Sequence, residues 1–116
     1  MILAAVDDLL FSSKIRTTAK LSGVDLTFAR TPDAIIAQAR ELKPSLIIFD
    51  LNCAKADPIN TLIALDADPQ LAGIRTIGFV SHVDGSTIQA ARQAGCDEVM
   101  ARSAFAGNLA EILTRG

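Results

Sequence analysis

The 116-residue sequence has few aromatic residues: it contains five Phe, no Trp and no Tyr, although half of its residues are hydrophobic. A core of this composition must be filled mainly by Ile, Leu, Val and Ala, which is typical of a sheet packed closely against helices. The 11 Lys and Arg residues are scattered and the net charge is only -2. Without a basic stripe or an aromatic stacking platform, nucleic acid is not expected as a direct partner.

Cysteine is equally scarce, and Cys53 and Cys96 lie far apart without the spacing of a zinc site or a redox motif. We expect both to be ordinary small apolar residues. No apolar run approaches the length of a membrane span. The first residues reach Asp7 without a basic leader, so we interpret them as a strand and not as a signal peptide. A single cytoplasmic domain over residues 1–116, with no membrane association, is therefore expected.

Segments typical of a strand and of a helix alternate along the whole chain. The predicted strands cover residues 1–6, 24–29, 46–49, 76–80 and 99–101. The predicted helices cover residues 9–21, 31–42, 57–67 and 84–94, and a last helix begins at Ser103 or Gly107. Strand 24–29 alternates apolar and polar residues, which favours an edge position. This order predicts right-handed parallel crossovers and a doubly wound, three-layer α/β sandwich.

Four of the predicted strands end at polar residues that can take part in chemistry. Asp7 and Asp8 follow the first strand, Asp50 the third, Ser81 the fourth and Arg102 the fifth. Each acid alone could be a strand terminator or a helix cap. Because the carboxyl ends of parallel strands meet at one edge of a sheet, however, these side chains are expected to share one site. Three carboxylates supply the hard oxygen ligands that suit Mg²⁺.

The whole chain resembles the receiver domains of bacterial response regulators, with the single-domain chemotaxis-type regulators as the nearest model. The residues that carry this resemblance are Val6-Asp7-Asp8, the strand end 47–50, Ser81, and the segment 94–98 that leads to Arg102. The resemblance implies a flavodoxin-like three-layer sandwich in which a five-stranded parallel sheet has the order 2-1-3-4-5 and is covered by five helices.

The resemblance also implies roles for the strand-end acids. Asp50 matches the aspartate that accepts a phosphoryl group from a histidine kinase or a phosphotransfer protein. Asp7 and Asp8, with Asp50 and the backbone carbonyl of Asn52, match the ligands of Mg²⁺. The physical chemistry agrees, because a carboxylate that attacks an anionic phosphoryl donor needs cations to offset the charge of the transition state. Self-phosphorylation and self-dephosphorylation would be the only enzymatic activities.

Two loops depart from the family's pattern. Ser81 matches the hydroxyl that binds the phosphoryl oxygens, but His82 follows it where a small residue is usual. His82 would restrict access to the site, or it is a loop histidine without a role. Arg102-Ser103 replaces the usual Lys-Pro pair. The planar guanidinium of Arg102 could clamp a phosphoryl group, or it could bind unmodified Asp50. Val99 occupies the position of the usual switch aromatic, so output would have to use backbone shifts of the loop and helix after Ser81, or another device.

Three functions are compatible with this sequence. The first is a signalling receiver that, once phosphorylated on Asp50, changes its affinity for an unknown output protein; the face of the fourth helix, fifth strand and fifth helix is the surface that such domains often use to dock or to form homodimers. The second is a pseudo-receiver that acts as an interaction module without phosphorylation. The third, a small phosphatase, is disfavoured because no glycine-rich phosphate loop follows the first strand and Asn52 stands where an acid would be needed.

Overall fold

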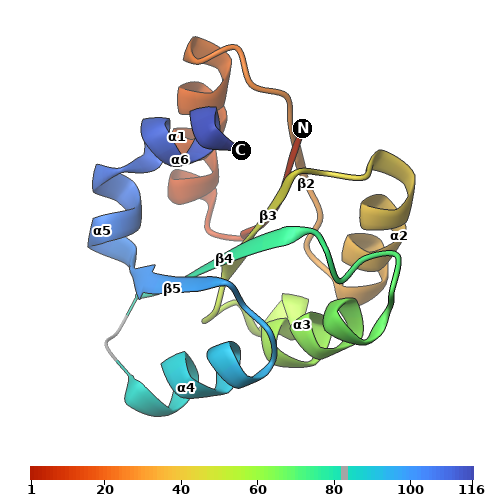
Figure 1. The fold of residues 1–116 in the computed structure, drawn as a ribbon. Helices are drawn as coiled ribbons and strands as arrows, with labels where there is room; N and C mark the ends of the chain where they lie inside the picture. Colours follow the sequence, from red (N-terminus) through yellow and green to blue (C-terminus); the bar gives the residue numbers. More distant parts are fainter. Residues whose placement is uncertain (82–83) are drawn as a thin grey trace.

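The computed structural model describes residues 1–81 and 84–116, and its centre is one parallel sheet (Figure 1). The sheet has the order β2-β1-β3-β4-β5. Its strands are β1 (Ile2–Ala5), β2 (Leu26–Phe28), β3 (Leu46–Asp50), β4 (Arg75–Val80) and β5 (Glu98–Ala101). The predicted order is therefore confirmed, and β2 lies at an edge of the sheet as its alternating pattern predicted.

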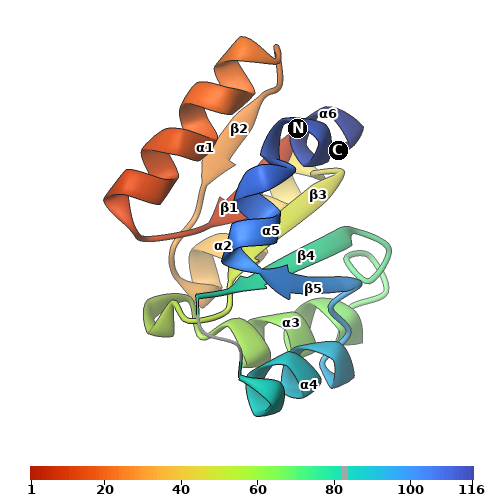
Figure 2. The same ribbon diagram turned by 90° about the vertical axis from the view of Figure 1, so that its left-hand side faces the viewer.

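Helices cover both faces of the sheet, which confirms the three-layer sandwich (Figures 1 and 2). The helices are α1 (Leu9–Leu21), α2 (Pro32–Leu42), the 3₁₀ helix η1 (Ala54–Ala56), α3 (Pro58–Ala67), α4 (Gly85–Gln93), α5 (Arg102–Gly107) and α6 (Leu109–Arg115). α1, α5 and α6 pack on one face, and α2, α3 and α4 pack on the other. Within the described residues, no helix is long and apolar enough to cross a membrane.

The last helix differs from the prediction of a single helix that begins at Ser103 or Gly107. It begins one residue earlier, at Arg102, directly after β5, and it is divided in two at Asn108. The side-chain amide of Asn108 donates to the carbonyl of Ala104 at 2.9 Å and closes the first of the two helices. Asparagine competes for backbone groups in this way, and the preceding Gly107 is a poor helix former. The break gives six α-helices in the described residues instead of five.

Three of the five Phe residues form one cluster on the face covered by α1 and α5. The ring centroids of Phe79 and Phe105 are 4.8 Å apart, and those of Phe11 and Phe79 are 5.1 Å apart. Phe11 lies in the first turn of α1, and Phe105 lies in the first turn of α5. The cluster therefore packs the beginnings of α1 and α5 together at the carboxyl end of the sheet. The other face is packed mainly by aliphatic side chains.

The helix starts and the cysteines agree largely with the sequence. Thr31 caps α2 by accepting a hydrogen bond from the backbone N–H of Ala34, and Pro32 occupies the first turn. α3 begins at Pro58 as predicted, but the side chain of Asp57 does not cap it. Cys53 and Cys96 are both free and buried, as expected for small apolar residues.

Candidate functional site

The register of the sheet brings the ends of its central strands to one level. Ala5 of β1 pairs with Phe49 of β3, Asp50 of β3 pairs with Phe79 of β4, and Val80 of β4 pairs with Ala101 of β5. Asp50 lies in one of these pairs, Ser81 and Arg102 follow the last pair directly, and Asp7 and Asp8 follow Ala5 after Val6. The strand ends therefore meet at one edge of the sheet, as the parallel topology requires.

Asp50 is the last residue of β3, and its side chain is half-buried. Burial raises the pKa of its carboxyl group above the ordinary value, because desolvation penalises the charged form. A hydrogen bond from the backbone N–H of Asn52 to Oδ1 at 3.0 Å and the positive charge of Arg102 lower the pKa, and the charge of Asp8 raises it. Nearby positive charge therefore favours the ionised form of Asp50.

Asp8 has both of its carboxylate oxygens engaged. Oδ1 accepts a hydrogen bond from the backbone N–H of Phe11 at 2.8 Å and caps α1. Oδ2 lies 3.6 Å from a terminal nitrogen of Arg102, and the central carbon of this guanidinium lies 4.3 Å from the centroid of the Phe11 ring. Arg102 therefore neutralises Asp8 while it stacks on the first aromatic residue of α1.

Asp7 pairs with a different arginine. Oδ1 of Asp7 lies 3.5 Å from Nε of Arg30, which also donates a hydrogen bond to the carbonyl of Val6 at 3.2 Å. The guanidinium of Arg30 lies 5.0 Å from the centroid of the Phe28 ring. Arg30 follows β2 and Arg102 follows β5, so the two arginines come from opposite edges of the sheet.

The sequence analysis overlooked Arg30 although a signal for it was present. The rule that identified Asp50, Ser81 and Arg102 selects polar residues at strand ends, and Arg30 directly follows the predicted strand 24–29. The role of Phe11 was also missed. Its signal was an aromatic residue one helical turn after Asp8, where its ring can support a side chain at the same edge of the sheet.

The three acids are not assembled into a ready-made metal site. Within residues 1–81 and 84–116, no group of three or more His, Cys, Asp or Glu side chains is arranged so that it could hold a metal ion. The carboxylate oxygens of Asp7, Asp8 and Asp50 have the chemistry that Mg²⁺ prefers, but two of these acids are paired with arginines. The cation-binding set of Asp7, Asp8, Asp50 and the Asn52 carbonyl therefore stays a prediction, and in this structure Arg30 and Arg102 supply Asp7 and Asp8 with positive charge.

Asn52 connects the strand end of Asp50 with the loop after β4. Its backbone N–H donates to Asp50, and its side-chain Oδ1 accepts a hydrogen bond from the backbone N–H of Ser81 at 2.7 Å. The sequence analysis gave Asn52 only a backbone role, so this side-chain link was missed. Ser81 is exposed, whereas His82 lies outside the described residues. Val99 is half-buried in β5 and packs against the core beneath α2, α3 and α4.

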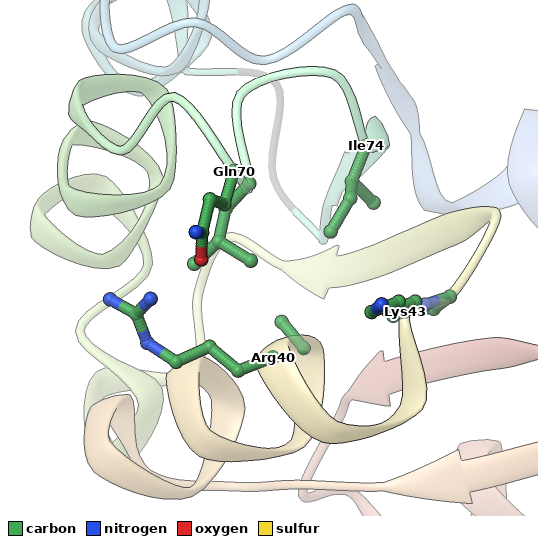
Figure 3. A pocket seen from close by; sticks show the side chains of 7 residues that line it. Arg40, Lys43, Gln70 and Ile74 are labelled. Atoms are coloured by element: carbon green, nitrogen blue, oxygen red, sulfur yellow. The ribbon is translucent and has the colours of Figure 1, made fainter.

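Two hollows of similar size lie at opposite ends of the sheet. One, of about 450 Å³, lies beside the candidate site and is lined by Phe11, Val80, Ser81, Ala101, Arg102, Ser103 and Ala106. The other, of about 460 Å³, lies between the end of α2 and the loop before β4, and it is lined by Ala39, Arg40, Lys43, Pro44, Gln70, Leu71 and Ile74 (Figure 3). The second hollow has no acid or hydroxyl in its lining. The first is lined by the Ser81 hydroxyl and the Arg102 guanidinium, which can bind an anionic group.

No family model and no curated protein matches this sequence, but solved structures do. The chemotaxis response regulator CheY4 of Vibrio cholerae is 17% identical with a TM-score of 0.83, and the match covers 98% of this chain and 95% of that chain. The phosphorylated cyanobacterial phytochrome response regulator RcpA and the Mn(2+)-bound response regulator Rcp1 are each 22% identical, with TM-scores of 0.80 and 0.78 and coverage of 98% of this chain and 88% of theirs. At these identities the likeness establishes architecture, and the chain has the fold of response-regulator receiver domains.

Proposed function

We propose that this chain is a signalling receiver that accepts a phosphoryl group on Asp50 from the phosphohistidine of a histidine kinase or a phosphotransfer protein. The observation that carries the proposal is the environment of Asp50, a half-buried carboxylate at a strand end that is influenced by the charge of Arg102. The full-length likeness to receiver folds, one of which is a phosphorylated response regulator, supports the same function.

The transfer is a displacement at phosphorus. A carboxylate oxygen of Asp50 forms a P–O bond while the P–N bond of phosphohistidine breaks. The imidazole leaves with the electron pair of that bond, and it is released as neutral histidine when its other ring nitrogen carries a proton. The Asn52 N–H fixes one carboxylate oxygen by its 3.0 Å hydrogen bond, which leaves the other oxygen to attack. Positioning of this kind and charge compensation are the main contributions that a protein makes to phosphoryl transfer.

Arg102 and Ser81 are the groups of the chain proposed to receive the phosphoryl oxygens. Both line the hollow beside the site. A guanidinium offers two parallel N–H donors to such oxygens, and a hydroxyl adds a neutral donor. Because Arg102 keeps its charge at every physiological pH, it can offset the negative charge that develops during transfer.

A divalent cation is a separate part of the proposal. Asp8, Asp50 and the backbone carbonyl of Asn52 would hold it, and Asp7 would contribute only if its pair with Arg30 opened. When bound, Mg²⁺ would supply further positive charge to the phosphoryl oxygens. The likeness to the Mn(2+)-bound response regulator Rcp1 supports cation binding in this fold.

The output is proposed to pass through a protein partner. Asn52 links the loop of Asp50 to the loop of Ser81, so a group added to Asp50 would disturb the Ser81 backbone through one side chain. No aromatic ring stands at Val99, and the change would therefore reach α4 through the backbone. The face formed by α4, β5 and α5 is the proposed surface for an output protein or for a second copy of the chain.

The proposal is tested with a small phosphodonor. The protein is incubated with Mg²⁺ and acetyl phosphate, and the intact mass is measured. Wild-type protein should gain one phosphoryl group, and Asp50→Asn should gain none. Asp25→Asn is the matched control, because Asp25 is an exposed acid at the opposite end of the sheet, and it should be modified like the wild type. Modification of Asp50→Asn, or no modification of the wild type, would contradict the proposal.

The second candidate is the pseudo-receiver, and the two arginine pairs favour it. Asp7 and Asp8 are already neutralised by side chains of the chain itself, so the acids have structural partners without any ligand. This candidate predicts that Asp50→Asn folds normally and binds the output partner as well as the wild type does. Partner binding that requires phosphorylated Asp50 would exclude it.

A further inference from the structure

Each of the two adjacent acids after β1 is paired with an arginine whose guanidinium lies over a phenylalanine ring. Arg30 pairs with Asp7 and lies over Phe28, and Arg102 pairs with Asp8 and lies over Phe11. An ion pair alone at this level of exposure is weak and mobile. An aromatic ring under the guanidinium favours a fixed position for its plane and thereby strengthens the pairing.

The phenylalanine ring under Arg102 is more firmly packed than the ring under Arg30. The ring beneath it, Phe11, is buried and packs in the cluster with Phe79 and Phe105. Arg102 itself begins α5, whose first turn holds Phe105 in the same cluster. The backbone of Arg102 and the ring under its guanidinium are thus fixed by one core. Lysine in this position would keep the charge but would lose the planar stacking.

We infer that the guanidinium of Arg102 lies where a divalent cation would bind Oδ2 of Asp8. A divalent cation must therefore displace this guanidinium in order to bind. Oδ1 of Asp8 is used by the cap of α1, and Oδ2 faces Arg102. A cation that takes Oδ2 must break the ion pair, and it must also bind close to a fixed positive charge. The inference refines the proposed phosphoryl-acceptor site, on which it rests, by making arginine the resident cation and metal the competitor.

The two arginines are not equivalent in this competition. Arg30 donates a hydrogen bond to the carbonyl of Val6 in addition to its pair with Asp7, and this bond anchors it to the backbone of β1. Among the described residues, Arg102 has the pair with Asp8 as its only ion pair. The positive charge of Arg102 also lowers the pKa of the Asp50 carboxyl group. Arg102 is therefore the arginine that controls access of a cation to the site, and Arg30 mainly holds Asp7 in place.

The test measures binding of Mn²⁺ alone to the unmodified protein by calorimetry and by the loss of the free-ion paramagnetic resonance signal. Arg102→Gln should bind Mn²⁺ about tenfold more tightly than the wild type, because one fixed positive charge beside the ion is removed. Arg102→Lys should lie between them. Arg115→Gln removes the same charge from an exposed pair with Glu111 on α6 and should stay within about twofold of the wild type, because solvent screens it.

An affinity of Arg102→Gln no higher than that of Arg115→Gln would overturn the inference, and so would the absence of Mn²⁺ binding in Arg102→Gln when circular dichroism shows that the variant is folded. The outcome is separable from that of the proposed function. Tighter Mn²⁺ binding by Arg102→Gln without any phosphoryl gain in the wild type would support the competition and refute phosphorylation. Phosphoryl gain with unchanged Mn²⁺ affinities would do the reverse.

Discussion

The two ends of the sheet hold their acids in different ways. At the amino end, the carboxylate of Asp97 accepts hydrogen bonds from the backbone N–H and the hydroxyl of Thr76, at 2.8 and 3.2 Å. The backbone N–H of Asp97 donates to the same hydroxyl at 3.0 Å. Thr76 is buried in β4, so these bonds tie the start of β5 to the strand beside it. The Asp97 carboxylate therefore provides hydrogen-bond acceptors for the N–H and hydroxyl of buried Thr76.

At the carboxyl end, the acids are paired over longer distances, and like Asp97 they are exposed to solvent. Asp7 and Asp8 lie 3.5 and 3.6 Å from their arginines, and their side chains are 46% and 42% exposed. Ion pairs with this exposure contribute little to stability, even where an aromatic ring under the guanidinium favours one position for it. Asp97 is thus joined to the neighbouring strand by short hydrogen bonds, whereas Asp7 and Asp8 face arginines over longer distances.

The largest effect is expected at the amino end. Asp97→Ala should lower the free energy of unfolding by about 2–3 kcal/mol, because it removes hydrogen bonds to a charged group and leaves the buried N–H of Thr76 without its acceptor. Asp97→Asn keeps an acceptor and should lose less. Urea denaturation gives both values. A loss for Asp97→Ala as small as that for Asp7→Asn would remove the distinction between the two ends of the sheet.

An intermediate effect is expected for Asp8, which accepts a short hydrogen bond from the backbone and also forms an exposed ion pair. Asp8→Ala should cost about 1 kcal/mol, because it removes the cap of α1. Asp8→Asn retains the capping oxygen, loses only the pair with Arg102, and should cost less than about 0.5 kcal/mol. The same denaturation experiment compares the two variants. Equal losses would show that the ion pair with Arg102 stabilises the fold more than this account allows.

The smallest effect is expected for Asp50→Asn, and it depends on pH. Because the pKa of Asp50 is raised in the folded protein, the folded state keeps this proton to higher pH than the unfolded state does. The stability that this group contributes is therefore present below the ordinary pKa of aspartate and is lost as the pH rises through the raised pKa. Asp50→Asn should be more stable than the wild type at neutral pH, by less than about 1 kcal/mol.

Denaturation curves of the wild type and Asp50→Asn at several pH values test this sign. The difference in the free energy of unfolding should disappear as the pH falls below the ordinary pKa of aspartate. A variant that is less stable than the wild type at neutral pH would mean that the contacts of the Asp50 carboxylate outweigh its desolvation.

The architecture and the location of the site could be predicted from the sequence because both follow from strand patterns and parallel topology. Asp50, Ser81 and Arg102 were identified as strand-end residues, and the structure places these strand ends at one edge of the sheet. The pairing of each side chain could not be predicted in the same way. The preference of Asp7 for Arg30 depends on how far a side chain from an edge strand reaches, and periodicity contains no such information.

The division of the last helix has a comparable origin. Asn108 is compatible with a helix interior in a pattern of apolar residues, and only the position of its amide over the carbonyl of Ala104 makes it a helix end. The stacking of Arg102 on Phe11 likewise depends on how α1 and α5 pack on one face. The sequence pattern did not predict the helix break at Asn108 or the contact between Arg102 and Phe11. The first depends on a local side-chain hydrogen bond, and the second depends on packing between helices.

Asp50, Asp8 and Arg102 are inferred to form one electrostatically coupled cluster at the carboxyl end of the sheet. This inference is tested most directly by following the side-chain carboxyl carbon of Asp50 by NMR during a pH titration without metal. The midpoint should lie above the ordinary value of aspartate, rise further in Arg102→Gln, fall in Asp8→Asn and stay unchanged in Arg115→Gln. A midpoint at the ordinary value that neither Arg102→Gln nor Asp8→Asn alters would contradict the account.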